Sequence, residues 1–437
     1  QTTYIGCIMK SSSSTRQQIQ VCIGKVGIPV GNLIYVKHGH RENTTFAYDE
    51  RWLANPDRFN VSADLNLLMG YQPRKAPSAH DSVFHFAIAD TAPDAWGRRV
   101  IARDHAKRRK VDPLLAPLTE MDYLLAVDDF SRVGALRLRD DDGNYCRTVE
   151  DGRRSTPPLL ELKRIYQASK AVEQGKESIE DLRYLQGKGT SLGGMRPKST
   201  VIDEDGQLAI GKFPSVGDLR SVTRGEVLAL RLAQRAGIDA APARIVELDG
   251  IPVAIIRRFD RDSRDGRIPY QSAASLLQAS REEDRSYTEI VDVIRSIGHE
   301  PTADIKQLWR RLVFNLLITN VDDHLQNHGF LHVEKGFWRL APAFDVNPFP
   351  DKERESKTWL SEQDGPITSL DMLMARCTYF SLSKAEALAV LADVYAAVLD
   401  WRRVALSTEV GLHSNELEDF APAFEHDQMD EAQILLT

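Results

Sequence analysis

The order of predicted elements in the middle of the chain constrains the fold most strongly. A Gly- and Ser-containing loop, GKGTSLGGMRPKS, precedes two β-prone runs joined by an acidic turn that ends at Asp205-Gly206, and this pattern predicts a hairpin. The next run, RGEVLALRLAQRAGI, has helical composition and ends at Gly237, a residue type that commonly terminates helices. A second hairpin is predicted around Asp249-Gly250.

Beyond Asp260 the sequence becomes mainly helical. The run IKQLWRRLVFNLLITN places Leu308, Leu312 and Leu316 on one helical face. A third hairpin is predicted with its turn at 334–336, and the C-terminal region is helical again. This order predicts an α+β, protein-kinase-like fold, with a small sheet-rich lobe, a larger helical lobe and an additional N-terminal α/β subdomain.

The chain of 437 residues is too long for one ordinary hydrophobic core. We expect four segments, which are a mobile N-terminus (1–18), an N-terminal subdomain (19–150), a small lobe with phosphate loop and hinge (151–260) and a helical catalytic lobe (261–437). A charged, Gly-containing stretch from Arg137 to Pro158 is interpreted as a linker or loop.

Composition narrows the functional classes. The net charge of −7 argues against nucleic acid as the main partner, because phosphate neutralisation requires a basic surface. Four widely separated cysteines form no CxxC pair, which is typical of a reducing cytoplasm and provides no zinc motif. No apolar stretch is long enough to span a membrane and no signal-peptide pattern opens the chain. We therefore expect a cytoplasmic protein without a membrane partner.

The run LITNVDDHLQNHGFL contains the residues with the clearest chemical interpretation. Asp322 and Asn327 are five residues apart, the spacing of the base and the metal-binding asparagine in a D-x-x-x-x-N catalytic loop. Asp345, in APAFD, follows after a hairpin at the position of a second metal-binding aspartate. Amide and carboxylate oxygens suit Mg²⁺, which prefers hard ligands.

Two upstream features complete a phosphoryl-transfer site. Lys212 closes a predicted strand, and Glu226 lies fourteen residues later in the first turn of the next helix, where the pair can grip phosphate. In the preceding loop, Gly193 and Gly194 permit close backbone approach to phosphates and Lys198 adds charge.

Other motifs fit less well. No G-x-G-x-x-G precedes the first hairpin, and GGMRPKS resembles a Walker A loop but has Pro197 in place of the second glycine. Neither an ordinary protein kinase nor a P-loop ATPase is predicted.

A metal hydrolase is an alternative, because His324, His328 and His332 are spaced by four next to Asp322 and Asp323. The β-prone FLHV after a glycine argues against one continuous helix. We expect His324 to support the catalytic loop by hydrogen bonding and the other two histidines to be structural.

These residues resemble the HipA-type serine/threonine kinase toxins of bacterial type II toxin–antitoxin systems. The similar pieces are FAYDERWLAN, IADTAPDAWGRRVIARD, DFSRVGALRL, TSLGGMRPKS, IGKF, RRFDR, NVDDHLQNHGFL and APAFD. They extend from about residue 20 to residue 350. This resemblance explains the missing G-x-G-x-x-G, because the family uses a different loop.

The resemblance implies Asp322 as catalytic base, Asn327 and Asp345 as Mg²⁺ ligands, and the segment 257–259 as a hinge whose backbone reads the adenine of ATP. The implied ATP-binding residues are Gly193, Gly194, Met195, Arg196, Pro197, Lys198, Lys212, Glu226, Arg257, Arg258, Phe259, Asp260, His324, Asn327 and Asp345. Departures from the family pattern are Arg257 at the hinge, residues 195–197 in the loop, and Gln326.

The family's inactivating autophosphorylation site falls on Ser191, with Thr190 as the less favoured acceptor. About two added negative charges next to the ATP phosphates would repel them and drive the loop out. An unmodified serine that caps a turn is the simpler alternative.

The resemblance also implies a biological role. The family inhibits translation by phosphorylating an aminoacyl-tRNA synthetase, most typically glutamyl-tRNA synthetase. A small helix-turn-helix antitoxin (HipB-like) neutralises the toxin and makes most of the contacts to operator DNA. A second hypothesis is a kinase-like scaffold that acts mainly as a co-repressor in a toxin–antitoxin–DNA complex.

Overall fold

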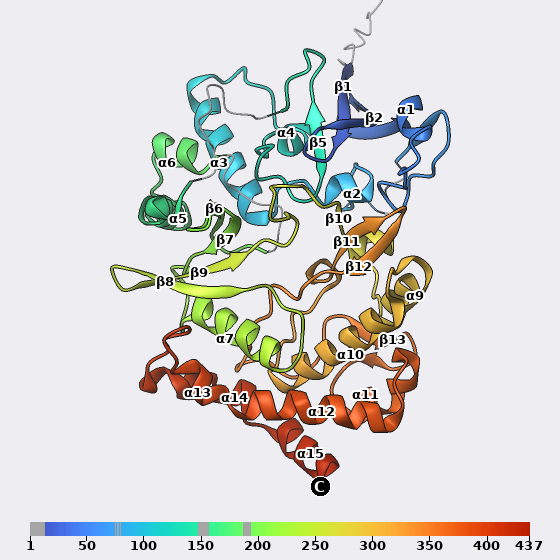
Figure 1. Cartoon of the computed structure of the whole chain (residues 1–437). Coiled ribbons are helices and arrows are strands. Elements are labelled where there is room, and N and C mark those ends of the chain that lie inside the picture. The colour runs from blue at the N-terminus through green and yellow to red at the C-terminus, as the bar shows by residue number, and fades with distance from the viewer. Residues whose placement is uncertain (1–13, 75, 77, 79, 147–156, 187–193) are drawn as a thin grey trace, which may run out of the picture.

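The N-terminal subdomain is built on an antiparallel sheet that lies at the top of Figure 1. The computed structural model describes residues 14–74, 76, 78, 80–146, 157–186 and 194–437. The strand order is β4-β3-β2-β1-β5. These strands are β1 (Ser14–Ile23), β2 (Ile28–His38), β3 (Arg41–Tyr48), β4 (Tyr71–Pro73) and β5 (Leu136–Arg139).

Two predicted boundaries in this region are wrong. Residues 14–18, expected to be mobile, belong to β1 and pair with residues 34–38 of β2. Arg137, expected to open a linker, lies in β5, whose alternating Leu-Arg-Leu-Arg sequence buries both leucines against the sheet core while it pairs with β1. The helices here are α1 (Glu50–Leu53), α2 (Phe86–Ala89), α3 (Ala95–Val111) and α4 (Glu120–Leu125).

The small lobe is a four-stranded sheet of order β6-β7-β9-β8. Its strands are β6 (Lys198–Ile202), β7 (Leu208–Lys212), β8 (Ala243–Leu248) and β9 (Ile251–Arg257). Both predicted hairpins are confirmed, with Gly206 and Gly250 in the left-handed conformation that their tight turns require. The associated helices are η1 (Leu159–Glu161), α5 (Leu162–Gln174), α6 (Ile179–Leu185) and α7 (Val222–Arg235).

Helix α7 ends as the sequence predicts. Its first residue after the cap, Gly237, has φ of 73°, and the N–H of Ile238 reaches back to Ala233. The helix carries a broad apolar face, so that Val227, Leu228 and Leu230 are almost completely buried.

The helical lobe forms the lower half of the molecule in Figure 1. It contains a small sheet of order β10-β11-β12 and a two-stranded sheet of β13 and β14, and the hairpin predicted at 334–336 joins β11 to β12. The strands are β10 (Tyr270–Ser272), β11 (Gly329–Glu334), β12 (Phe337–Leu340), β13 (Trp359–Ser361) and β14 (Gly365–Pro366). The longer helices are α9 (Tyr287–Ile297), α10 (Pro301–Leu317), α12 (Lys384–Leu399) and α15 (Asp427–Leu436). The shorter ones are α8 (Ala273–Leu276), η2 (Leu325–Asn327), α11 (Leu370–Arg376), η3 (Cys377–Phe380), α13 (Trp401–Ala405), η4 (Ser414–Glu416) and α14 (Leu417–Phe424).

Helix α10 leads into the run that contains Asp322 and Asn327. Pro301 occupies its first turn, where the missing N–H costs nothing, and Trp309 and Leu312 are buried in the lobe core. The helix stops at Leu317, and Thr319 then takes a left-handed φ of 56°, which ends the helical path. None of the helices in the described part of the chain combines the length and apolar character needed to cross a bilayer.

Candidate active site

A buried lysine between two carboxylates forms the back of the site. Lys212 Nζ, at the end of β7, lies 2.6 Å from Glu226 Oε1 on α7 and 2.7 Å from Asp345 Oδ1. Burial alone would lower the pKa of Lys212, but the two carboxylates outweigh it and raise the pKa above its usual range. The sequence-predicted lysine–glutamate pair is therefore brought together, with Asp345 as a third member.

The pKa values of the two acids shift in opposite directions. Burial would raise the pKa of Asp345, but Lys212 and Lys198 hold it well below its usual range. Burial raises the pKa of Glu226, and the lysine only partly offsets this effect. Asp345 also has a left-handed φ of 53°, an uncommon conformation for a non-glycine residue that clusters at functional sites.

The run that contains Asp322 and Asn327 follows α10 as an extended segment and the single turn η2. Asn327 is 6% exposed, and its Nδ2 donates to the C=O of Asp322 at 3.1 Å. Asn327 Oδ1 is buried without a hydrogen-bond partner among the described residues. A buried amide oxygen without a donor is costly unless a ligand satisfies it.

One cavity of about 600 Å³ is lined by Lys212, Asp322, Asn327 and Asp345. The unsatisfied Asn327 oxygen and the ionised Asp345 carboxylate thus border the same space. An amide oxygen and a carboxylate match the ligand preference of Mg²⁺, so the residues present fit this ion.

Asp322 is placed differently from the buried cluster. Its side chain is 48% exposed, and Lys357 Nζ lies 3.4 Å from its Oδ1. The carboxylate is thus open to an approaching hydroxyl group, as the role of a base requires. Sequence reasoning missed Lys357, because a lysine thirty-five residues beyond Asp322 carries no spacing signal.

The phosphate-loop prediction is only partly within the described chain. Ser191, Thr190 and Gly193 lie outside the described residues. Gly194 has φ of 68° and borders the cavity, together with Met195 and Arg196. Arg196 forms an ion pair with Asp218 on the cavity wall through two hydrogen bonds. The C=O of Pro197 accepts a hydrogen bond from the N–H of Phe213.

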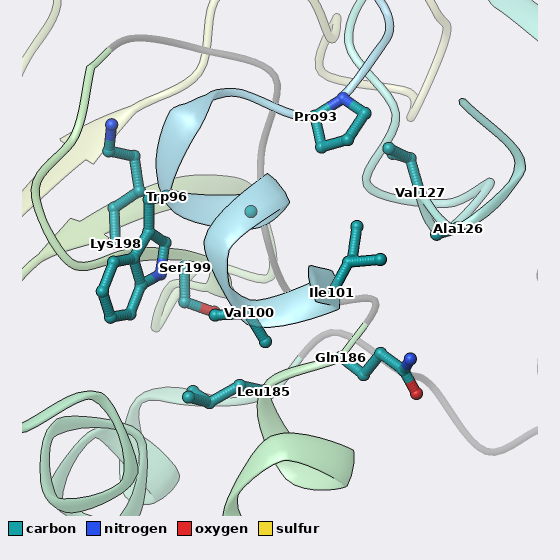
Figure 2. Close-up of a pocket in the computed structure, with 11 residues that line it drawn as sticks. Pro93, Trp96, Val100, Ile101, Ala126, Val127, Leu185, Gln186, Lys198 and Ser199 are labelled. Carbon is teal, nitrogen blue, oxygen red and sulfur yellow. The ribbon is translucent and has the colours of Figure 1, made fainter. Parts of the chain in front are cut away.

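Lys198 has a partner that the sequence did not reveal. Its Nζ lies 3.0 Å from Asp94 Oδ2, and the lysine and aspartate side chains are 2% and 6% exposed. Asp94 is the N-cap of α3, and burial raises its pKa to about 6 although Lys198 opposes the effect. Figure 2 shows Lys198 alongside Trp96 of α3, in a small pocket that these residues line. The N-terminal subdomain thus contributes a carboxylate next to the phosphate loop.

In the hinge, the backbone amides of Arg257 and Arg258 are hydrogen-bonded, whereas Phe259 packs against an aromatic ring. The N–H of Arg257 donates to Pro242 and the N–H of Arg258 donates to Leu208, so these two amides are already paired within the small lobe. Phe259 packs 5.4 Å from the ring of Phe344. Any adenine contact by the segment 257–259 must therefore use its carbonyl groups or the Phe259 amide.

Arg258 and Asp260 do not present their side chains to the cavity lined by Lys212 and Asp345. They form an ion pair at 2.6 Å in which both side chains are 1% exposed. Asp260 also accepts the N–H of Gly134 at 2.7 Å and pairs with Arg261. Burial would raise the pKa of Asp260, but the two arginines hold it far below its usual range. This cluster fastens the small lobe to the N-terminal subdomain. The buried ion pair occupies both side chains, which leaves the backbone of the hinge for the predicted contact with ATP.

The histidines are not a metal cluster. His328 Nε2 faces Asp323 at 2.9 Å, and His332 lies on β11, stacks on Phe59 at 3.8 Å and accepts the N–H of Gly336. No group of three or more metal-binding side chains (His, Cys, Asp or Glu) occurs within the described residues. The equal spacing fails because β11 replaces the helix that it would require.

His324 supports the loop by hydrogen bonding as expected, but within the described part of the chain it does so through its backbone and not through its ring. Its Nδ1 is buried without a partner among the described residues, and only the backbone of His324 bonds to Asp322 and Asn327. Asp323 instead organises the loop, because its carboxylate accepts from Tyr287 at 2.6 Å and Asn315 at 2.9 Å.

These features define a kinase-like protein, with two lobes around a cavity that holds a strand lysine, a helix glutamate and a D-x-x-x-x-N loop. Comparisons with known proteins agree. Residues 21–143 match the HipA N-terminal domain, and residues 190–402 match the HipA-like C-terminal domain. The chain belongs to the HipA family.

Individual relatives are distant. Y4mE of Sinorhizobium fredii (strain NBRC 101917 / NGR234), named as a candidate kinase, is 23% identical over 419 residues, which cover 86% of this chain and 92% of the relative. A candidate kinase of Haemophilus influenzae is 25% identical over 188 residues, which cover 38% of this chain and 55% of that protein.

A solved structure has the same fold. It is the Shewanella oneidensis MR-1 toxin–antitoxin complex of HipA, HipB and operator DNA, in which the matching chain has a TM-score of 0.66 and 14% sequence identity. The match covers 96% of each chain.

Proposed function

We propose that this protein is an ATP- and Mg²⁺-dependent serine/threonine protein kinase. The observation that carries the proposal is the shared cavity, where Lys212 is clamped between Glu226 and Asp345 opposite Asp322 and Asn327. Phosphoryl transfer requires positioned charges more than covalent chemistry, and these side chains supply them.

Each residue has a role in this reaction. Lys212 binds ATP phosphates and is oriented by Glu226, while Asn327 and Asp345 hold Mg²⁺. The ion neutralises charge on the phosphate oxygens when it is bound. Asp322 accepts the proton of the acceptor hydroxyl as that oxygen forms its bond to the γ-phosphorus and the bond to ADP breaks.

We propose a toxin role in the cytoplasm, on the basis of the HipA family membership. The substrate is an aminoacyl-tRNA synthetase, by family precedent glutamyl-tRNA synthetase, and its modification inhibits translation. A helix-turn-helix antitoxin of the HipB kind neutralises the toxin and carries most of the contact to operator DNA, in keeping with the net charge of −7.

Self-inactivation belongs to the same proposal. Ser191 is the autophosphorylation site, in the loop that precedes Gly194 and Lys198. A phosphoserine there would add about two negative charges beside the ATP phosphates and displace the loop from the site.

The test is incubation of the purified protein with γ-labelled ATP and Mg²⁺, alone and with a bacterial lysate, followed by mapping of the labelled residues. We expect label in the chain itself and in a synthetase-sized band, and neither with Asp322→Asn. ATP binding without any labelling would favour the co-repressor scaffold, and label confined to residues other than Ser191 would remove the switch assignment.

A further inference from the structure

Lys357 is held opposite Asp322 by the backbone on both sides of the catalytic aspartate. The N–H of Lys357 donates to the C=O of Val321 at 3.1 Å, and Thr358 Oγ1 donates to the C=O of Asp323 at 2.7 Å. Thr358 is 4% exposed, so this attachment is part of the lobe core. The position of Lys357 relative to Asp322 is therefore fixed by the fold, although its side chain is 60% exposed.

Lys357 also lies where two cavities meet. The first is the cavity of about 600 Å³ bordered by Lys212 and Asp345, and the second, of about 560 Å³, lies between the N-terminal subdomain and the helical lobe. Gly194, His324 and Lys357 line both. A nucleotide in the first cavity and an acceptor segment entering through the second would meet beside Lys357.

Four of the other cations that border the first cavity are held in ion pairs, and a fifth, Lys352, has its Nζ 4.1 Å from the centroid of the Phe349 ring. Lys198 is paired with Asp94, Lys212 with two carboxylates, Arg196 with Asp218 and Arg220 with Asp351. The contact of Lys357 with Asp322 is longer, at 3.4 Å. A solvent-exposed pair of this kind contributes little to stability, so fold stability does not account for it.

We propose that Lys357 is a further catalytic residue, which contacts the γ-phosphoryl group in transfer and neutralises charge on its equatorial oxygens. This inference rests on the proposed kinase function. In the step, the bond from the γ-phosphorus to the ADP oxygen breaks, the acceptor oxygen forms the new bond, and its proton passes to Asp322. Lys357 exchanges no proton in this step and releases Asp322 as it turns to the phosphoryl group.

The experiment compares Lys357→Met and Lys357→Arg with the wild-type chain. Transfer of label from γ-labelled ATP to the chain itself and to purified glutamyl-tRNA synthetase gives kcat, and titration with a fluorescent ATP analogue gives Kd. We expect Lys357→Met to lower kcat about 10²-fold, the scale of losing one preorganised charge-stabilising donor. Kd should change by less than about 3-fold, and Lys357→Arg should restore most of the rate.

Lys163→Met is the matched control. Lys163 is also 60% exposed and also pairs with an aspartate, Asp249, but it lies on α5 outside both cavities. Its replacement should leave kcat unchanged. The inference would be overturned, and the kinase proposal would stand, if Lys357→Met transferred phosphate at the wild-type rate. The same holds if Kd rose by the factor by which the rate fell. Absence of transfer by the wild-type chain would remove the kinase proposal and this inference with it.

Discussion

The two ends of the active-site cavity are built in opposite ways. At the back, Lys212 and Glu226 have side chains that are 10% and 4% exposed, and they are locked with Asp345 by contacts of 2.6–2.7 Å. At the mouth, Asp322 and Lys357 are 48% and 60% exposed and lie 3.4 Å apart. The back is held together by its own buried ion pairs, whereas the mouth is open to solvent.

This difference has an energetic basis. A charge removed from a buried cluster leaves its partner unpaired in a poorly solvated place, which costs far more than the loss of an exposed pair. Substitutions at the back should therefore affect nucleotide and metal binding together with stability. Substitutions at the mouth should affect the rate of transfer and little else.

The largest effect is expected from Asp345→Asn, which disrupts the back of the cavity. The change removes the proposed metal ligand and one of the two carboxylates on Lys212, so transfer of label from γ-labelled ATP should fall on the order of 10³-fold or more. Nucleotide affinity in the presence of Mg²⁺ should weaken in parallel. Asp393→Asn, on the exposed face of α12, is the control. Retention of transfer within about 10-fold would show that Asp345 is not a metal ligand.

A second substitution tests the effect of burial on stability at an ion pair that has no part in the proposed reaction. Asp260→Asn breaks an ion pair with Arg258 that is more buried than the Lys212 cluster but lies outside the catalytic cavity. The free energy of unfolding, measured by urea denaturation, should fall by about 3 kcal/mol because Arg258 and Arg261 lose their charged partner. Asp249→Asn, whose side chain is 70% exposed, should change the free energy of unfolding far less. Equal effects of the two substitutions would contradict the account.

The smallest effect is a pH dependence that involves neither end of the cavity. Burial lowers the pKa of His332 to about 4, below its usual value of about 6.5. Between these values the unfolded chain binds the proton and the folded chain does not, so stability is lost as the pH falls. At about 1.4 kcal/mol per pKa unit, His332 should reduce the free energy of unfolding by about 2 kcal/mol at pH 5 relative to pH 7.

Chemical denaturation at both pH values tests this prediction. His332→Gln should remove that share of the acid destabilisation, and His40→Gln, at an exposed position, should not. An unchanged pH profile in His332→Gln would show that the ring is protonated in the fold.

Much of the fold followed from local signals in the sequence. The Asp-Gly turns at 205–206 and 249–250, the glycine after α7 and the apolar face of α10 all act over a few residues, so the sequence predicts them directly. The five-residue spacing of Asp322 and Asn327 is local in the same sense.

The remaining contacts depend on packing between distant segments. Asp94 is 104 residues from Lys198, and Lys357 is 35 residues from Asp322. Nothing in the sequence near Asp94 distinguishes it from an ordinary helix cap. Tyr287, the partner of Asp323, lies on the distant helix α9. Such residues acquire their roles from the tertiary fold, which one sequence does not reveal.

The most direct test of the division between back and mouth is Asp322→Asn, assayed for both binding and transfer. Binding is the Kd for Mg²⁺·ATP by isothermal titration calorimetry, and transfer is the initial rate of labelling with γ-labelled ATP. The account predicts a Kd within about 3-fold of wild type and a rate lower by about 10²–10⁴-fold, the range for loss of a general base. A parallel loss of nucleotide affinity, or labelling at the wild-type rate, would contradict it.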